Sequence, residues 1–313
     1  MGIVIQFILR LLALLPLRVH YALGRFVSWM TEKVLRYRVG DVTVNLARSF
    51  PDLKYEELKD LRHRFYLHFG EMLAETVWFG GCRNPERLRR QHLVELDNPE
   101  ELDRLYENAP SVMVLMSHSG NWELIGGIGS YNYIGKPCDI DENDFFVVYR
   151  LQSIKFWNRI MKANRTAPLK DRKNYRGYLE STKAVRFVLE HRDEKIIYNF
   201  ITDQYPYAEC KGYMRLYFMN QKCVSMKGAA ELARRMGMAV CYMSMPQERR
   251  GLYKIRYETI CEDASSMSAE AIMARYYKLL EADINAQPWN YLWTHRRWKD
   301  ETGEEWKMDT INN

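Results

Sequence analysis

The chain has 313 residues, of which 47% are hydrophobic and 27% charged, and its formal net charge is +6. This composition is typical of a globular protein with a sizeable core and excludes a disordered or fibrous chain. The six cysteines include no C-x-x-C pair, so neither a zinc ribbon nor a disulfide framework is expected, and a reducing compartment fits best.

The amino-terminal region is basic and apolar. The first fifty residues contain seven basic and two acidic residues and so carry most of the net charge. Residues 3–15 are almost entirely apolar, but this run is shorter than the roughly 20 residues of a transmembrane helix. A second apolar stretch, 19–30, includes Arg25 and Trp29 and is typical of a helix in the headgroup layer. We expect residues 1–38 to form a membrane-associated helical segment; the alternative is that both helices pack on the protein's own core.

A long helix follows. From Tyr55 onward apolar residues recur every three or four positions, which predicts a helix that ends at Gly80 and Gly81. Its two histidines, His63 and His68, match no metal-ligand pattern, so we expect them to be structural or exposed.

The most informative stretch is Ser111-Val-Met-Val-Leu-Met-Ser-His-Ser-Gly-Asn-Trp-Glu-Leu. Its apolar run has the length of a buried strand, the small polar residues after the run predict a turn, and Trp122 opens a helix. His118 therefore follows the carboxyl end of a strand, where ligand sites of α/β sheets gather.

His118 and Glu123 are candidates for an acid–base pair. Five residues apart on one helix they would be about 140° out of phase and would not meet. A turn at Gly120 and Asn121 allows the Glu123 carboxylate to reach back to one imidazole nitrogen. That bond would fix the tautomer and raise the basicity of the other nitrogen, as a general base requires. The alternative is a structural histidine that caps the strand.

Two further strands end on polar residues. The strand 145–149 is followed by Arg150, and the strand 196–201 is followed by Thr202-Asp203-Gln204. We expect His118, Arg150 and Asp203 to lie at the same edge of one sheet. The intervening helix, 152–163, and the residues just after it add four cations that can bind phosphate or simply be solvated: Lys155, Arg159, Lys162 and Arg165.

The remaining pattern alternates helices and strands. A helix capped by Ser181 is expected to turn Val185, Val188 and Leu189 inward. A further helix is predicted at 226–236, capped by Ser225, and two strands follow at 239–245 and 252–259. The last predicted helix is 268–287. The fold class is therefore α/β, with a single mixed, mostly parallel sheet flanked by helices.

Five ordered motifs resemble those of the bacterial lipid A biosynthesis (late) acyltransferases, within the wider group of His-x4-Asp/Glu glycerolipid and lysophospholipid acyltransferases. The motifs are Val44-Asn45-Leu46 with Phe50-Pro51, His118-Ser-Gly-Asn-Trp-Glu123, Val148-Tyr149-Arg150, Thr202-Asp203-Gln204 and Trp293-Thr-His-Arg-Arg-Trp-Lys299. The closing motif mixes aromatics and cations as a headgroup or phosphate surface would. No nucleic-acid-binding module accompanies it, so nucleic acid is not an expected partner.

The resemblance implies that an acyltransferase domain, residues 39–313, moves an acyl chain from acyl carrier protein to a hydroxyl of a lipid A precursor. The transfer would take place at the cytoplasmic face of the bacterial inner membrane, to which the amino-terminal segment would anchor the protein. It implies no metal, no cofactor and no covalent enzyme intermediate.

The resemblance also assigns the candidate site residues. His118 and Glu123 would be catalytic, and Arg150, Arg159, Asp203 and Gln204 would lie near the substrate. Asp203 would orient an arginine or the substrate. The spacing departs from the family's by about a residue near Arg159, which leaves Lys162 and Arg165 as alternatives to it.

Two other functions remain open at this point. The first is an acyltransferase with the same pair but a lysophospholipid or an aminolipid as acceptor. The second is a non-catalytic, lipid-binding protein of the membrane surface.

Overall fold

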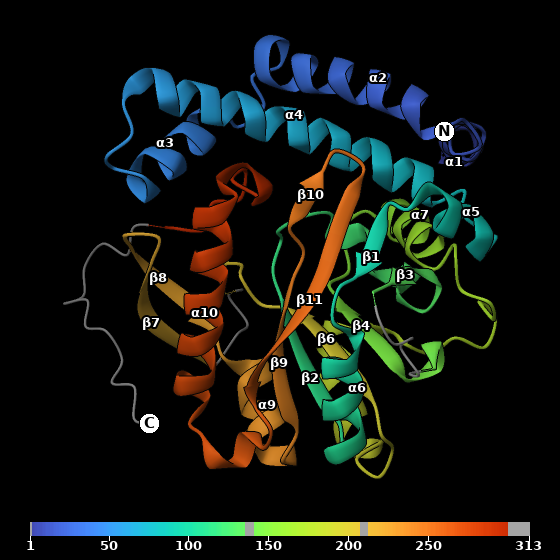
Figure 1. The fold of residues 1–313 in the computed structure, drawn as a ribbon, viewed down its shortest axis with the longest axis vertical. Helices are drawn as coiled ribbons and strands as arrows, with labels where there is room; N and C mark the ends of the chain where they lie inside the picture. Colours follow the sequence, from blue (N-terminus) through green and yellow to red (C-terminus); the bar gives the residue numbers. More distant parts are fainter. Residues whose placement is uncertain (1, 135–140, 207–211, 300–313) are drawn as a thin grey trace.

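The computed structural model describes residues 2–134, 141–206 and 212–299. Figure 1 shows a central sheet with helices packed around it and the long helix α4 running across one end. The last part of the expected 39–313 domain, residues 300–313, lies outside the described residues.

The helices follow the predicted periodicity closely. The α-helices are α1 (Gly2–Leu12), α2 (Leu17–Trp29), α3 (Val39–Ser49), α4 (Tyr55–Phe79), α5 (Pro85–Gln91), α6 (Pro99–Asn108), α7 (Lys155–Arg165), α8 (Ser181–Glu190), α9 (Gly228–Met236) and α10 (Ala269–Ala286). Shorter helical turns are the π-helical η1 (Met30–Val34) and the 3₁₀ turns η2 (Trp122–Ser130), η3 (Glu142–Asp144), η4 (Ala264–Ser266) and η5 (Pro288–Asn290).

The main sheet is mixed and mostly parallel, as expected from the sequence. Its strands are β1 (Val94–Leu96), β2 (Val112–Met116), β3 (Asn132–Tyr133), β4 (Phe145–Tyr149), β5 (Tyr178–Glu180), β6 (Ile197–Ile201), β9 (Ala239–Ser244), β10 (Gln247–Arg249) and β11 (Leu252–Cys261). They lie in the order β3-β1-β11-β9-β2-β6-β4-β5, with β10 paired to β11. The pairs β9–β11 and β10–β11 are antiparallel, and the other pairs are parallel.

The hydrophobic core has two layers, one on each face of this sheet. Every residue of β2 is buried. Met113 and Leu115 point into the layer that contains α9 and α10, whereas Val112, Val114 and Met116 point into the opposite layer. This alternation follows from the two-residue period of a strand. A strand buried on both faces reads as a continuous apolar run, which is why the sequence identifies β2 so clearly.

The sheet order brings the three predicted polar strand ends together. Strand β6 lies between β2 and β4, and both pairings are parallel. The residues that follow these strands, beginning at Ser117, Arg150 and Thr202, therefore leave the sheet at one edge. The prediction of a shared edge is confirmed.

The amino-terminal helices pack against the rest of the protein on one face and are exposed on the other. Helix α2 lies along α4 (Figure 1), and Gly24 and Gly70 meet so closely that a Cβ on either would overlap the other's carbonyl. The buried residues of α2 lie along one face, which points toward α4. The other face of α1 and α2 exposes Phe7, Ile8, Leu11, Val19, Leu23, Phe26 and Trp29. Among the described residues, no helix is long and apolar enough to cross a membrane.

Four local predictions are wrong. Ser181 does not cap α8, because it is the first residue of the helix and the N-cap residue, Glu180, makes no side-chain cap hydrogen bond. In α8 the buried residues are Ala184 and Val188, whereas Val185 and Leu189 are 57% and 52% exposed, because only one face of this short helix meets the sheet. Ser225 does not cap α9. It belongs instead to an unpredicted hairpin of β7 (Tyr213–Phe218) and β8 (Gln221–Met226), and its hydroxyl lies 2.8 Å from that of Tyr277.

Candidate active site

The His118 imidazole lies at the carboxyl edge of the sheet, held by a carboxylate from the neighbouring strand. Its Nδ1 is 2.7 Å from Oδ1 of Asp203, and its backbone N–H donates to Oδ2 of Asp203 at 3.2 Å. Because Met116 pairs with Ile201, His118 and Asp203 each lie two residues beyond paired positions on adjacent strands. The register of β2 and β6 thus places the two side chains next to each other.

Gln204 contacts the second nitrogen of the ring. Its side-chain Nε2 lies 3.0 Å from Nε2 of His118. An amide nitrogen is only a donor, so Nε2 of His118 is the acceptor and carries the lone pair. The proton of the neutral ring is then on Nδ1, which donates to Asp203. The arrangement therefore presents a basic nitrogen on the side away from Asp203.

Asp203 is charged despite its burial. Its side chain is 2% exposed, and burial alone would raise its pKa. The proximity and hydrogen bonds of His118, with a smaller contribution from Arg297, outweigh burial and lower the pKa of Asp203. A buried, ionised carboxylate on Nδ1 stabilises the imidazolium that forms when Nε2 accepts a proton.

Glu123 has a different partner from the one predicted. Its two carboxylate oxygens accept bidentate hydrogen bonds of 2.6 Å each from Nε and Nη2 of Arg165. The prediction that Glu123 forms a hydrogen bond with His118 is therefore wrong. The physical reason is the 3₁₀ geometry of η2, which advances about 120° per residue. Trp122 packs its ring edge against His118, with centroids 4.8 Å apart, and the next side chain points away toward α7.

The Glu123–Arg165 pair forms a second fixed charge group beside the turn. The side chains of Glu123 and Arg165 are 10% and 21% exposed. Nη1 of Arg165 also donates to the hydroxyl of Tyr178 at 2.9 Å, and Tyr149 stacks on Tyr178 with ring centroids 3.8 Å apart. These bonds use three of the five N–H donors of a guanidinium. Of the four cations on and just after the predicted helix, Arg165 is thus the one that joins the motif around His118.

The other predicted substrate residues lie on the surface. Arg150 is exposed directly after β4, and Arg159 is exposed on α7. The structure thus brings together His118, Asp203 and Gln204 and pairs Glu123 with Arg165. No metal-binding group of three or more His, Cys, Asp or Glu residues occurs in the part of the chain that the structure describes.

The turn that carries His118 is fastened at several points. Gly120 has a φ of 65°, and a Cβ there would overlap the carbonyl of Met245. Its N–H donates to the carbonyl of Asn290 at 2.9 Å, and the N–H of Leu292 donates to the carbonyl of His118 at 3.1 Å. The left-handed conformation favours glycine, so the shape of the turn depends on having glycine at this position.

Two motifs far apart in the sequence meet beside this turn. Asn45 donates to the carbonyls of Trp293 at 2.9 Å and of His295 at 3.1 Å. Burial lowers the pKa of His295 to about 4. Arg297 is 1% exposed and donates to the carbonyl of Val224 and the hydroxyl of Tyr277. The closing motif was expected to form a surface for headgroups or phosphates. Part of it is instead buried in the core, where its hydrogen bonds support the site.

Asn121 connects the turn to the buried Glu75. Its amide donates to Oε2 of Glu75 at 3.0 Å and to the carbonyl of Met72 at 3.1 Å. Tyr21 of α2 and Tyr253 of β11 donate to the same carboxylate at 2.8 and 2.9 Å. Burial raises the pKa of Glu75 to about 7 although these hydrogen bonds oppose the shift. No sequence motif marks this network, so it could not be predicted from the sequence.

The chain matches the family described as bacterial lipid A biosynthesis acyltransferase over residues 3–167 and 169–300. The match includes all the residues of the site described above. No curated protein matches the chain.

Proposed function

The chain belongs to the bacterial lipid A biosynthesis acyltransferases, and on that basis we propose that it moves a fatty acyl chain from acyl carrier protein to a hydroxyl of a lipid A precursor. His118 is the general base. The observation that supports this most directly is the imidazole whose Nδ1–H is held by a buried, ionised Asp203 while Nε2 faces outward with its lone pair.

The reaction needs no covalent enzyme intermediate. Nε2 of His118 takes the proton of the lipid hydroxyl as that oxygen attacks the thioester carbonyl. The tetrahedral intermediate collapses, the carbon–sulfur bond breaks, and the departing thiolate takes the proton back from the imidazolium. Asp203 stabilises the imidazolium in between, and Gln204 moves off Nε2 to admit the hydroxyl.

Glu123 supports this chemistry through Arg165. The bidentate bond holds the guanidinium rigid, and Arg165 keeps further N–H donors for an oxyanion or a phosphate. Arg150, exposed directly after β4, and Arg159, exposed on α7, contact the phosphates of the substrates or of the carrier protein's prosthetic arm.

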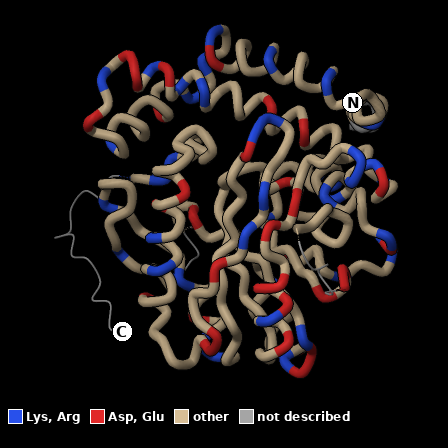
Figure 2. The backbone as a smooth tube through the Cα atoms, in the orientation of Figure 1, with Lys and Arg blue, Asp and Glu red and all other residues tan. Residues whose placement is uncertain are grey.

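The apolar face of α1 and α2 contacts the cytoplasmic face of the inner membrane. Residues 1–31 contain no acidic residue, and basic residues are spaced along this segment (Figure 2), as contact with anionic lipid requires. Replacing Phe26 and Trp29 by Ser should reduce co-sedimentation with anionic vesicles, whereas Tyr55→Ser, at a residue that is 72% exposed on α4, should not. Equal loss in both variants would refute this contact.

Acyl transfer by the purified protein tests the function. Acyl carrier protein loaded with a fatty acid is the donor, and a lipid A precursor competes with a lysophospholipid and an aminolipid as acceptors. We expect mass spectrometry to find the acylated lipid A precursor and a free-thiol reagent to detect stoichiometric thiol release. Acylation of another acceptor alone would change the substrate class, and lipid binding without thiol release would indicate a non-catalytic protein.

A further inference from the structure

The buried carboxylate of Glu75 gathers hydrogen-bond donors from three separate parts of the fold. Figure 1 shows α4, the helix of Glu75, between α2 and the central sheet. Tyr21 of α2 donates to Oε1, whereas Tyr253 of β11 and the amide of Asn121 both donate to Oε2. Glu75 and Asn121 are fully buried. The mechanism proposed above gives this carboxylate no task.

The side chain of Asn121 is bound to α4 through both its nitrogen and its oxygen. The amide nitrogen donates to Glu75 and to a backbone carbonyl of α4, and Oδ1 accepts from the hydroxyl of Thr76 at 3.3 Å. The next residue is Trp122, whose ring packs edge-on against the imidazole of His118 with centroids 4.8 Å apart. A displacement of Asn121 would therefore be transmitted to the imidazole.

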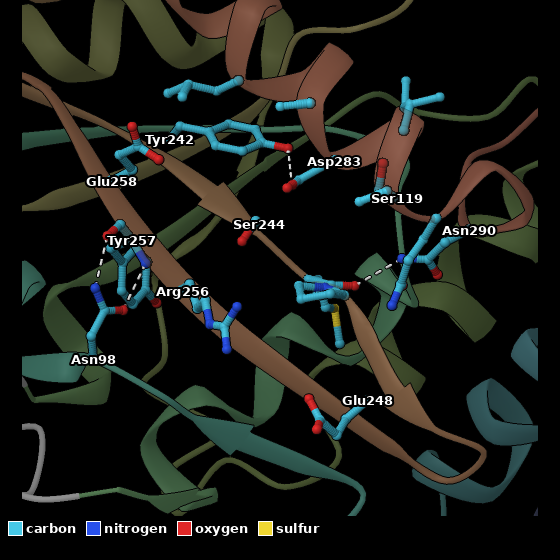
Figure 3. Close-up of a pocket in the computed structure, with 17 residues that line it drawn as sticks. Asn98, Ser119, Tyr242, Ser244, Glu248, Arg256, Tyr257, Glu258, Asp283 and Asn290 are labelled. Carbon is cyan, nitrogen blue, oxygen red and sulfur yellow. Dashed lines mark hydrogen bonds between the residues drawn. The ribbon is translucent and has the colours of Figure 1, made fainter.

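The turn that carries His118 has less packing support on another side. Ser119 of the turn and Asn290 belong to the lining of a cavity of about 510 Å³ (Figure 3). Groups that border a cavity lose the contacts that a packed neighbour would supply. The position of the turn therefore depends on its hydrogen bonds, of which those from Asn121 to α4 are one set and the backbone bonds to Asn290 and Leu292 another.

Three donors fit an ionised carboxylate. Such a group only accepts hydrogen bonds, whereas a protonated carboxyl or a glutamine amide would direct a hydrogen toward one of the donors. Burial opposes ionisation and raises the pKa of Glu75 to about 7, although the three hydrogen bonds act in the opposite direction. The charged form thus costs stability near neutral pH. A buried charge that costs stability is characteristic of functional sites.

The other titratable groups around this carboxylate are known from the structure. Glu71 lies on the same helix, and its charge adds to the effect of burial on the pKa of Glu75. Arg250, in the turn between β10 and β11, pairs with Glu71 at 2.7 Å. Burial lowers the pKa of His68, which is also on α4, so this imidazole is neutral near pH 7. Burial and the charge of Glu75 raise the pKa of both tyrosines, which therefore stay protonated.

We propose that Glu75 is a positioning residue for acyl transfer: its carboxylate holds Asn121 and thereby the turn that places His118. This inference rests on the proposed function, because it gives Glu75 a task in that reaction. Glu75 acts through the geometry of the turn and not by contact with the reacting groups. Through Tyr21 the same carboxylate also ties the turn to α2.

Steady-state acyl transfer by Glu75→Gln tests the effect on the rate. At pH 8 we expect kcat to fall about 10²-fold at unchanged KM, because a small displacement of the base slows the chemical step without removing a contact to substrate. The matched control is Glu71→Gln, since Glu71 is an acid of the same helix that pairs with Arg250. A wild-type kcat in Glu75→Gln, or an equal loss in Glu71→Gln, would overturn the proposal.

The pH dependence of kcat separates positioning from a merely structural role. As the pH falls from 8 to 5.5, wild-type Glu75 binds a proton, so the ratio of the wild-type kcat to that of Glu75→Gln should shrink toward one. Protonation of the general base affects both proteins and cancels in this ratio. A ratio that stays constant with pH would mean that the charge of Glu75 does not position the turn.

Two further variants should move the midpoint of this change in opposite directions. Tyr21→Phe removes one of the hydrogen bonds that lower the pKa of Glu75, so the midpoint should move to higher pH. Glu71→Gln removes a neighbouring negative charge, so the midpoint should move to lower pH. Shifts of the same sign in both variants would contradict the assignment of the midpoint to Glu75.

Hydrogen exchange of the full chain reports on the turn without any turnover. The amide of Gly120, which donates to Asn290, should exchange about tenfold faster in Glu75→Gln than in wild type and at the wild-type rate in Glu71→Gln. Wild-type exchange in Glu75→Gln would overturn the positioning role whatever the rate of transfer. Faster exchange in that variant, together with no transfer by the wild-type protein, would reject the proposed function and not the role of Glu75 in the turn.

Discussion

Nδ1 of His118 and Oδ1 of Asp203 lie 2.7 Å apart across two adjacent parallel strands. The partner that orients the imidazole therefore comes from β6, 85 residues along the chain, and not from the turn that carries the histidine. The mechanism therefore depends on Asp203, and not on Glu123, to orient the imidazole and to set its tautomer.

Asp203→Asn should lower the rate of acyl transfer about 10²- to 10⁴-fold while the fold survives. An amide at this position cannot stabilise the imidazolium, and it can donate to Nδ1 and so favour the wrong tautomer. The rate of thiol release measures the loss, and nitrogen NMR of the imidazole reports the tautomer. A variant with the wild-type rate would show that Asp203 is not the orienting group.

Glu123 and Arg165 should behave as one unit. Glu123→Gln and Arg165→Lys should each lower the free energy of unfolding by about 2 kcal/mol and reduce transfer, because each breaks the same bidentate bond. The double variant should be no worse than either single variant. Denaturant unfolding and initial rates give both quantities.

The control for that pair is an exposed one. Arg186 and Glu190 form an ion pair with side chains that are 83% and 52% exposed. Glu190→Gln should change the free energy of unfolding by less than about 0.5 kcal/mol. Additive losses in the Glu123 and Arg165 double variant would mean that the two residues act independently.

Gly120→Ala should disturb both stability and activity. The left-handed conformation at this position costs a residue with a Cβ about 1 to 2 kcal/mol, and the added carbon also overlaps the carbonyl of Met245. Because His118 lies two residues away, we expect transfer to fall about 10²-fold. Gly40→Ala is the control, since a Cβ at that position in α3 meets nothing within 4 Å. Equal effects at both glycines would contradict the account of the turn.

The protonation of Glu75 should make part of the protein's stability dependent on pH. Its pKa is raised from 4.5 to about 7, so the folded state binds the proton more tightly than the unfolded state does. The stabilisation is complete below pH 4.5 and is lost as the pH rises through 7. Relative to Glu75→Gln, wild-type protein should lose about 3 kcal/mol of unfolding free energy across this window.

The comparison with the Gln variant is necessary because other buried groups titrate nearby. Burial lowers the pKa of His68 to about 4, and its contribution to stability is lost as the pH falls toward that value, which is the opposite trend. Denaturant unfolding of both proteins at pH 5 and pH 8 gives the difference. A difference that does not change with pH would show that Glu75 is already ionised at pH 5.

Much of the framework of the site could be predicted from the sequence. The apolar run of β2, the strand ends at Arg150 and Asp203 and the long periodic helix α4 follow from local patterns. The mostly parallel sheet follows from their alternation. These features depend on residues close together in the chain, where the periods of a helix and a strand are informative.

The partners within the site could not be predicted in the same way. That Asp203 meets His118 depends on β6 lying next to β2 in register, which is a property of the sheet order. That Glu123 turns to Arg165 depends on η2 being a 3₁₀ turn. The Glu75 network also escaped, because its buried bonds join distant segments. The hairpin of β7 and β8 is local, but its two-residue turn, Met219-Asn220, lacks the glycine that usually marks such a turn in a sequence.

The most direct test of the central claim is the initial rate of acyl transfer from loaded acyl carrier protein by purified His118→Ala, compared with wild type at equal thermal stability. We predict a folded protein that still binds vesicles and transfers at least about 10²-fold more slowly. A His118→Ala variant that transfers at close to the wild-type rate would contradict the proposal that this imidazole removes the proton from the lipid hydroxyl.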